Sequence, residues 1–315
     1  MKVIEHIEKA TSPLFSYEII PPARGKSAQE IIDIVKQLQP FNPPYIDVTS
    51  HSAEAYYEET DSGTIKRRIR KKRPGTISIC GIIQNRFKID TVAHLLCRGF
   101  TREETEDALI ELNFLGIQNV LAIRGDETNY KKPVQKDRSI NSYASNLVTQ
   151  LGDLKKAIYL DEILNPDPID MCVGVGGYPE KHFEAPNLKT DIANLKKKVD
   201  AGAEYIVTQM FFDNDVYFGF VEKCRAAGIT VPIIPGIKIL DRVKQLTVIP
   251  KNFFVNLPDE LVDEITSSPE HIKEIGKQWG LKQAEGLLNA GVKNIHFYVL
   301  NDAGTVTQIV KQLSQ

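Results

Sequence analysis

The sequence predicts one α/β domain over residues 1–315, a (β/α)8 TIM barrel, and three observations support it. Eight short runs rich in β-branched or aromatic residues alternate with helical patterns. Most of these runs are apolar almost throughout, as is typical of strands covered on both faces. No Pro/Gly/Ser-rich linker divides the chain. The predicted strands are Leu14–Ile20, Tyr45–Thr49, Thr76–Ile82, Asn119–Ile123, Asp170–Val175, Tyr205–Gln209, Val231–Ile234 and Ile295–Val299.

The intervals between these runs contain helical patterns. Gln29–Leu38 has apolar residues at helical spacing, and Thr101–Leu115 opens with the capping box Thr101-x-x-Glu104. The longest interval, between predicted strands seven and eight, holds two or three helices, so extra helices are predicted there. A doubly wound sheet is the main alternative. The glycine cluster that begins at Gly174 argues against it, because Pro179 occupies the last position of a G-x-G-x-x-G pattern.

Charge and composition exclude several classes of protein. The chain has 39 Lys and Arg against 41 Asp and Glu, a formal charge of −2, which argues against nucleic acid as a partner. It has no apolar run of about 18 residues, so a membrane span is not expected. Charged residues stand where a signal peptide would be apolar. Four cysteines without metal-ligand spacing predict reduced thiols and a cytoplasmic protein.

Chemistry in such a barrel belongs at the carboxyl ends of the strands. The polar residues predicted there are Glu18, Thr49, Gln84, Arg124, Asp126, Tyr178, His182, Gln209, Lys238, Asn301 and Asp302, and His94 is also expected just after a strand.

Glu18 is the strongest candidate for a catalytic acid. Strand alternation places it on one face with Ser16 and Ile20. Burial there would raise its pKa and favour a neutral carboxyl group that can donate a proton. A structural ion pair with Lys or Arg is the alternative. The same choice holds for Asp126, where Gly125 allows close approach of a ligand and Arg124 could meet a phosphate or pair with the carboxylate.

Other candidates carry weaker signals. Asp191, Asn194 and Lys198 share one helical face with Lys197 at its edge, which suits a nucleotide but also an ordinary solvated surface. His94 and His182 could contact a cofactor or be structural. Gln209 could hydrogen-bond the amide edge of a heterocycle.

Nine motifs in the same order as in a known family make the chain resemble methylenetetrahydrofolate reductase from about Ser16 to Asn301. They are Ser16-Tyr-Glu18-Ile-Ile-Pro21-Pro22, Asp47-Val-Thr49, His94-Leu-Leu-Cys97, Leu121-Ala-Ile-Arg124-Gly-Asp126, Gly177-Tyr178-Pro-Glu-Lys-His182, Lys198-Val-Asp-Ala-Gly-Ala203, Thr208-Gln209-Met-Phe-Phe212-Asp213, Ile234-Pro-Gly236-Ile237 and His296-Phe-Tyr298.

The resemblance implies an FAD enzyme that reduces 5,10-methylenetetrahydrofolate to 5-methyltetrahydrofolate with NADH or NADPH, by ping-pong hydride transfer, in one-carbon metabolism and methionine synthesis. Carried over by motif, Glu18 is the general acid and Asp126 lies beside both flavin and pterin. Gln209 is shared by folate and nicotinamide. The positions that match FAD contacts are Thr49, His94, Arg124, Gly125, Ala144, Tyr178, His182, Ala185, Asp191, Asn194, Lys197 and Lys198.

The chain departs from the family pattern after the eighth strand. Asp302 stands where relatives commonly have an arginine that holds the folate tail, so Lys238 is the expected replacement cation. The resemblance also implies a homo-oligomer, without the C-terminal regulatory domain of eukaryotic relatives. Three alternatives stay open: a proline dehydrogenase-like FAD barrel, a flavin-free lyase with Lys238 as Schiff-base amine, and a partner-dependent relative without its own NAD(P)H activity.

Overall fold

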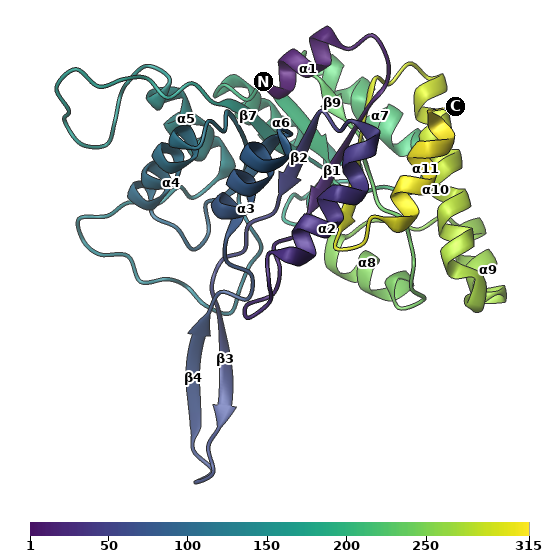
Figure 1. Ribbon diagram of the computed structural model, residues 1–315, viewed down its shortest axis with the longest axis horizontal. Coiled ribbons are helices and arrows are strands. Elements are labelled where there is room, and N and C mark those ends of the chain that lie inside the picture. The colour runs from purple at the N-terminus through teal and green to yellow at the C-terminus, as the bar shows by residue number, and fades with distance from the viewer. Residues whose placement is uncertain (315) are drawn as a thin grey trace.

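The computed structural model describes residues 1–314 and confirms the barrel (Figure 1). Its main sheet is parallel throughout, in the order β10-β11-β1-β2-β5-β6-β7-β8-β9. β9 and β10 are two halves of one strand interrupted at Pro235, so the nine segments occupy eight positions around the barrel. The strands are β1 (Leu14–Ile19), β2 (Tyr45–Val48), β5 (Asp90–Leu96), β6 (Asn119–Ile123), β7 (Cys172–Gly177), β8 (Tyr205–Thr208), β9 (Ile233–Ile234), β10 (Gly236–Ile237) and β11 (Asn294–Leu300).

Helices surround the strands. They are α2 (Gln29–Leu38), α3 (Thr76–Ile82), α4 (Arg102–Phe114), α5 (Ala144–Leu154), α6 (Leu188–Asp200), α7 (Asn214–Ala226), α8 (Gln245–Phe253), α9 (Asp259–Ser267), α10 (Ile272–Asn289) and α11 (Gly304–Leu313), with short turns of other helix types at Gln39–Phe41, Ile83–Phe87 and Pro269–His271. The capping box of α4 is confirmed, because Thr101 and Glu104 exchange side-chain and backbone hydrogen bonds. The interval between strands seven and eight contains α8, α9 and α10, which confirms the extra helices predicted there.

One predicted strand is wrong. Thr76–Ile82 forms helix α3, and the third strand of the barrel is β5. Helical spacing buries Ile79, Cys80 and Ile83 while Ser78 stays exposed. Because β-branched residues lower helix propensity only slightly, this burial outweighs the β-rich composition of the segment. The other seven predicted strands are confirmed, β6 with the predicted bounds and the other six with shifted ends.

Two site predictions change with this correction. Gln84 follows α3 instead of a strand, and its side chain accepts a hydrogen bond from the backbone N–H of Thr91, near the start of β5. It therefore lies at the amino end of the barrel, away from the predicted chemistry. His94 lies inside β5 instead of after a strand end, so its side chain is held in the sheet.

Two further elements close one end of the barrel and extend the other. α1 (Val3–Lys9) covers the amino end, where the fully buried Val3 packs with Tyr45, Leu121 and Tyr205. The antiparallel hairpin of β3 (Glu54–Glu59) and β4 (Ile65–Arg70) projects from the opposite end (Figure 1). Neither α1 nor the β3–β4 hairpin was predicted from the sequence. Within residues 1–314 no helix combines the length and the apolar character that a membrane crossing requires.

Alternation along each strand divides its residues between two environments. On β1, Phe15, Tyr17 and Ile19 pack in the main core, while Ser16 and Glu18 take the alternate, axis-facing positions. The axis is apolar near α1 and becomes polar toward the carboxyl ends of the strands. This polar part of the axis contains the candidate site.

Candidate active site

The register of the parallel strands brings Glu18 and Asp47 to the same level of the barrel. Glu18 is the cross-strand partner of Asp47 on β2 and of Tyr298 on β11. β5 follows β2 in the sheet, and His94 lies two residues beyond Val92, the partner of Asp47. Side chains from four strands therefore meet at the axis.

The imidazole of His94 lies between two carboxyl groups. Its Nε2 atom is 3.2 Å from Asp47 Oδ2, within hydrogen-bond distance, and 3.7 Å from Glu18 Oε2. The three side chains are 4%, 1% and 12% exposed for His94, Asp47 and Glu18. The cluster is thus inside the barrel, with Glu18 as the member that reaches solvent most.

Further polar groups continue the cluster. His296 Nδ1 lies 3.0 Å from Ser16 Oγ and 4.0 Å from Asp47 Oδ1. The hydroxyl of Tyr298 donates to the Thr208 carbonyl oxygen at 2.6 Å, and Lys238 Nζ donates to the Tyr298 carbonyl oxygen at 3.0 Å. Lys238 follows β10, and this hydrogen bond holds its side chain against β11, near Glu18.

Burial and neighbouring charges together set the pKa values of the cluster. Burial raises the pKa of Glu18 to about 7, with the His94 cation opposing this shift and the Asp47 charge adding to it. Burial by itself would lower the pKa of His94, but the hydrogen bond that His94 donates to Asp47 and the charges of both carboxylates raise it overall. Burial lowers the pKa values of Lys238 and His296. Glu18 is consequently a carboxyl group that holds a proton near neutral pH and can donate it.

A second group of residues lines the rim beside β6. Arg124 forms an ion pair with Glu184, and its guanidinium lies 5.1 Å from the centre of the Tyr143 ring. Gly125 has a φ of 85°, a conformation that glycine adopts without strain, and the next residue, Asp126, is exposed. Asp126 also lies near enough to His51 to influence its pKa. The rim thus presents an anion and a cation next to the cluster.

Of the residues predicted after β7 and on α6, some lie at the end of β7 and others lie on the exposed surface of α6. The Tyr178 and His182 rings meet edge-on at 4.6 Å, and the backbone N–H of His182 donates to Asp191 Oδ2 at 2.8 Å. Lys198 Nζ donates to the Gly176 carbonyl oxygen at 2.5 Å, at the end of β7. In contrast, Lys197 donates to Asn194 at 3.3 Å on the exposed surface of the helix.

The remaining predicted residues lie at the ends of strands or helices. Ala144 is the first residue of α5, and Ala185 is buried. Gln209 follows β8, where its backbone N–H donates to the Gly177 carbonyl oxygen at 2.7 Å and its Oε1 accepts from the N–H of Met210. Among residues 1–314 the NH₂ group of the Gln209 side chain has no hydrogen-bond partner, so it is available to a ligand.

Several polar atoms at this end of the barrel fit a large polar ligand. Thr49 Oγ1 and Arg124 Nε are buried but have no hydrogen-bond partner among residues 1–314. A Cβ atom added at Gly176 would have no neighbour closer than 3.9 Å, so backbone is accessible there. Both orphaned atoms belong to residues predicted to contact FAD. The part of the chain that the structure describes has no cluster of metal-ligating residues.

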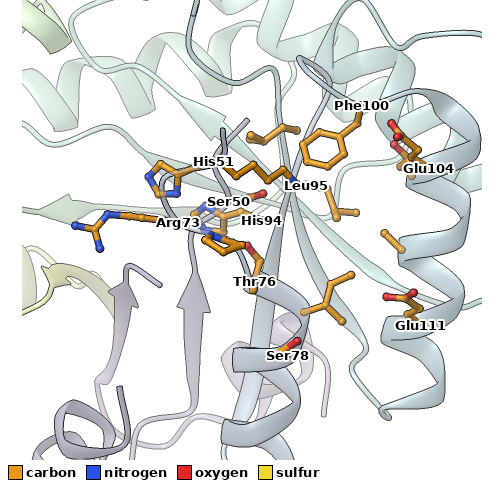
Figure 2. A pocket seen from close by; sticks show the side chains of 17 residues that line it. Ser50, His51, Arg73, Thr76, Ser78, His94, Leu95, Phe100, Glu104 and Glu111 are labelled. Carbon is orange, nitrogen blue, oxygen red and sulfur yellow. The ribbon is translucent and has the colours of Figure 1, made fainter. Parts of the chain in front are cut away.

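A cavity of about 260 Å³ extends sideways from this region. Figure 2 shows His51 and Arg73 at one end, beside His94, and Glu104 and Glu111 on α4 at the other. It runs outward between α3 and α4, so it adjoins the cluster without containing Glu18.

Sequence reasoning did not identify Asp47 or Glu184 as site residues. Asp47 had a signal, because it is the one charged residue in the short apolar strand Tyr45–Val48. Glu184 lies in a loop with other charged residues, and its pairing with Arg124 depends on the fold alone.

Comparison with known proteins identifies the family. The model of the methylenetetrahydrofolate reductase family matches residues 2–314. The chain is 31% identical over 292 residues to 5,10-methylenetetrahydrofolate reductase of Escherichia coli, covering 91% of this chain and 86% of that protein. It is 30% identical over 310 residues to methylenetetrahydrofolate reductase 1 of Schizosaccharomyces pombe, covering 97% of this chain and 46% of the relative.

A plant relative and a solved structure are also similar to this chain. The probable methylenetetrahydrofolate reductase (NADH) of Oryza sativa is 29% identical, and the match covers 96% of this chain and 48% of that protein. The chain thus spans about half the length of these eukaryotic relatives. A solved structure from Clostridium thermocellum, described as binding two copies of 5-methyl-5,6,7,8-tetrahydrofolic acid, shares the fold with a TM-score of 0.60 at 13% identity, covering 99% of this chain and 98% of that one. On the family match and the Escherichia coli relative, the chain belongs to the methylenetetrahydrofolate reductase family.

Proposed function

We propose that the protein reduces 5,10-methylenetetrahydrofolate to 5-methyltetrahydrofolate with electrons from NADH or NADPH, through bound FAD, in one-carbon metabolism. Membership of the family supports the reaction, and the names of plant relatives support NADH as one electron donor. The observation that carries the assignment is Glu18, a carboxyl group inside the barrel whose pKa is raised to about 7.

The rim residues would hold the cofactor. Arg124, Lys198 and Lys197 would supply positive charge toward its phosphates, while Asp191 and Asn194 would bond hydroxyl groups. Tyr178 and His182 would contact its flat ring systems. The buried, unpaired atoms of Thr49 and Arg124 support this placement, since a bound polar group would satisfy them. His94, Gly125, Ala144 and Ala185 complete the proposed set.

FAD, when bound, would supply the group that accepts hydride from NAD(P)H and passes it to folate in a ping-pong sequence. The proton would come from a residue of the chain itself. Glu18 would donate its proton to the bridging nitrogen of the folate, the C–N bond to the methylene carbon would break, and Glu18 would be left as a carboxylate. The resulting iminium carbon accepts hydride.

Three residues would bind the substrate. Asp126 would meet the pterin from the exposed rim, and the free amide of Gln209 would reach the same heterocycle. Lys238 would supply positive charge on the β11 side, where Asp302 stands in place of the family arginine. The contact of Lys238 with Tyr298 and its charge effect on Glu18 support this role, and its charge would act on the reacting end of the folate as well as on its carboxylates.

Replacing Glu18 by glutamine tests the proposal. We expect Glu18→Gln to bind flavin and to be reduced by NAD(P)H at a rate within about twofold of wild type, while folate reduction falls by about 10² or more, the usual contribution of a general acid. Anaerobic rapid mixing, with flavin absorbance followed in each half-reaction, separates the two steps.

Glu58→Gln, on the exposed hairpin, serves as the matched control and should leave both half-reactions unchanged. Normal folate turnover in Glu18→Gln would remove Glu18 from its role. A purified protein that binds no flavin would contradict the proposed reaction itself.

A further inference from the structure

We infer that Asp47 is a positioning residue that holds His94 on its own carboxylate and thereby leaves the proton on Glu18. This inference rests on the proposed role of Glu18 as general acid. It assigns a function to a residue that does not reach the mouth of the barrel, because Asp47 is 1% exposed.

The carboxyl groups of Asp47 and Glu18 compete for one hydrogen-bond donor, the Nε2 atom of His94. The same Nε2 atom of His94 faces both carboxyl groups, and it lies within hydrogen-bond distance of Asp47 Oδ2 but not of Glu18 Oε2, which is 3.7 Å away. An N–H group donates well to one acceptor at a time. With Asp47 in place, His94 is committed to Asp47, and Glu18 is left without a strong donor from this ring.

The other oxygen of Asp47 makes the carboxylate more dependent on His94. Oδ1 is buried and has no hydrogen-bond partner in the described part of the chain, with His296 Nδ1 4.0 Å away. A buried carboxylate of this kind depends on its remaining partner for stabilisation. The hydrogen bond from His94 is therefore the main interaction that stabilises the charge of the Asp47 carboxylate.

Charge acts in the same direction. The negative charge of Asp47 disfavours ionisation of Glu18 at the next strand. Without that charge, Glu18 would be the remaining carboxylate within reach of His94, and an ion pair between them would favour the ionised form of Glu18. Both effects mean that removing the charge of Asp47 moves the proton equilibrium of Glu18 toward ionisation.

The neighbouring groups do not take over this function. Around Glu18, Tyr298 uses its hydroxyl on the Thr208 carbonyl oxygen, and Lys238 uses its ammonium on the Tyr298 carbonyl oxygen. Around Asp47 lie His296, Tyr45, Tyr205 and Cys80, and burial raises the pKa values of the two tyrosines and the cysteine, so these three are neutral at physiological pH.

Asp47→Asn, which keeps the size of the side chain, tests the inference. We expect the falling limb of the pH profile for folate reduction to move down by about one pH unit, so that the rate falls about tenfold above pH 7 and approaches wild type below about pH 6. Flavin reduction by NAD(P)H should change less than about twofold. Infrared difference titration provides a second readout, with the Glu18 carboxylic acid band identified by its absence in Glu18→Gln.

A matched control lies at the other end of β5, where Asp90 forms a similar pair with His6 at 2.8 Å. Asp90→Asn should leave the pH profile of folate reduction unchanged. An unmoved or upward-moved profile in Asp47→Asn, or an equal loss of rate at every pH, would overturn the inference. The infrared titration reports the proton on Glu18 even if the protein fails to reduce folate, so the two proposals can fail separately.

Discussion

At the scale of single residues, the burial that suits Glu18 to its proposed role as an acid also has a cost in stability. Its carboxyl group is surrounded by protein, so the ionised form loses hydration that it would have in the unfolded chain. The folded protein therefore binds the Glu18 proton more tightly than the unfolded chain does. This difference makes the stability of the protein depend on pH.

The sign of this dependence follows from the two pKa values. The pKa of Glu18 rises from 4.5 to about 7 on folding, so its favourable contribution is complete below pH 4.5 and is lost as the pH rises to 7. We expect Glu18→Gln to be as stable as wild type near pH 4.5 and more stable by about 3 kcal/mol above pH 7. Urea unfolding at a series of pH values measures the difference, and a constant offset across that range would contradict it.

The axis-facing position of Glu18 could be predicted from the sequence, but the contacts among the residues around it could not. A charged residue at an axis-facing position of an apolar strand is visible as a pattern of period two. That His94 meets Asp47 depends on strand order and register, and the misassignment of Thr76–Ile82 had removed β5 from the predicted sheet. The pairing of Arg124 with Glu184 likewise joins two loops that are far apart in sequence.

At the scale of elements, two glycines allow α10 to pack against the segment after β10. A Cβ atom added at Gly276 would lie 1.9 Å from the Leu240 carbonyl oxygen, and one at Gly280 would lie 2.2 Å from Ile239 Cδ1. Glycine inside a helix costs about 1 kcal/mol relative to alanine, so close packing accounts for its presence here. The segment that α10 packs against, Ile239 and Leu240, directly follows Lys238 in the chain.

Gly276→Ala should therefore destabilise the protein, because backbone at Leu240 would have to move. We expect a loss of about 1–3 kcal/mol in the free energy of unfolding, as for other overpacked sites. Gly219→Ala on α7 is the matched control: its Cβ would be 3.6 Å from the Lys223 Nζ atom, an ordinary contact, and we expect a gain of about 0.5–1 kcal/mol from helix propensity. Urea midpoints that shift in the same direction for both variants would argue against the packing explanation.

Elements were predictable where burial and composition agreed. β6 has the predicted bounds, and the apolar runs of β1 and β2 end within one residue of them. In α3, composition favoured a strand while burial on one side favoured a helix, and burial prevailed. The β3–β4 hairpin had no apolar alternation to reveal it, because every residue of β4 is exposed.

At the scale of the whole molecule, closure of the barrel depends on the interruption of its seventh strand. Pro235 lacks an N–H group, and at the next residue the Gly236 N–H donates to the side-chain oxygen of Thr208 at 2.9 Å. The Pro235 carbonyl oxygen accepts from the His296 N–H on the other side. The side-chain oxygen of Thr208 thus replaces one backbone acceptor in the hydrogen-bond ladder between strands.

Thr208→Val keeps the shape of that side chain and removes the acceptor. Leaving the buried Gly236 N–H unpaired should cost about 1–3 kcal/mol and should speed exchange of that amide with solvent. Thr149→Val, on the exposed face of α5, should change neither quantity. Hydrogen exchange at Gly236 that is unaltered in Thr208→Val would show that closure does not depend on this bond.

The covering of the amino end by α1 has a consequence for the order of events in the proposed reaction. Val3 and the apolar layer around Tyr45 and Tyr205 seal that end, so water reaches Glu18 from the opposite end of the barrel. A ligand above Glu18 would occupy the same passage. The carboxylate left after proton donation would then be replenished by solvent only once the product has departed, and one proton would be committed to each molecule of substrate.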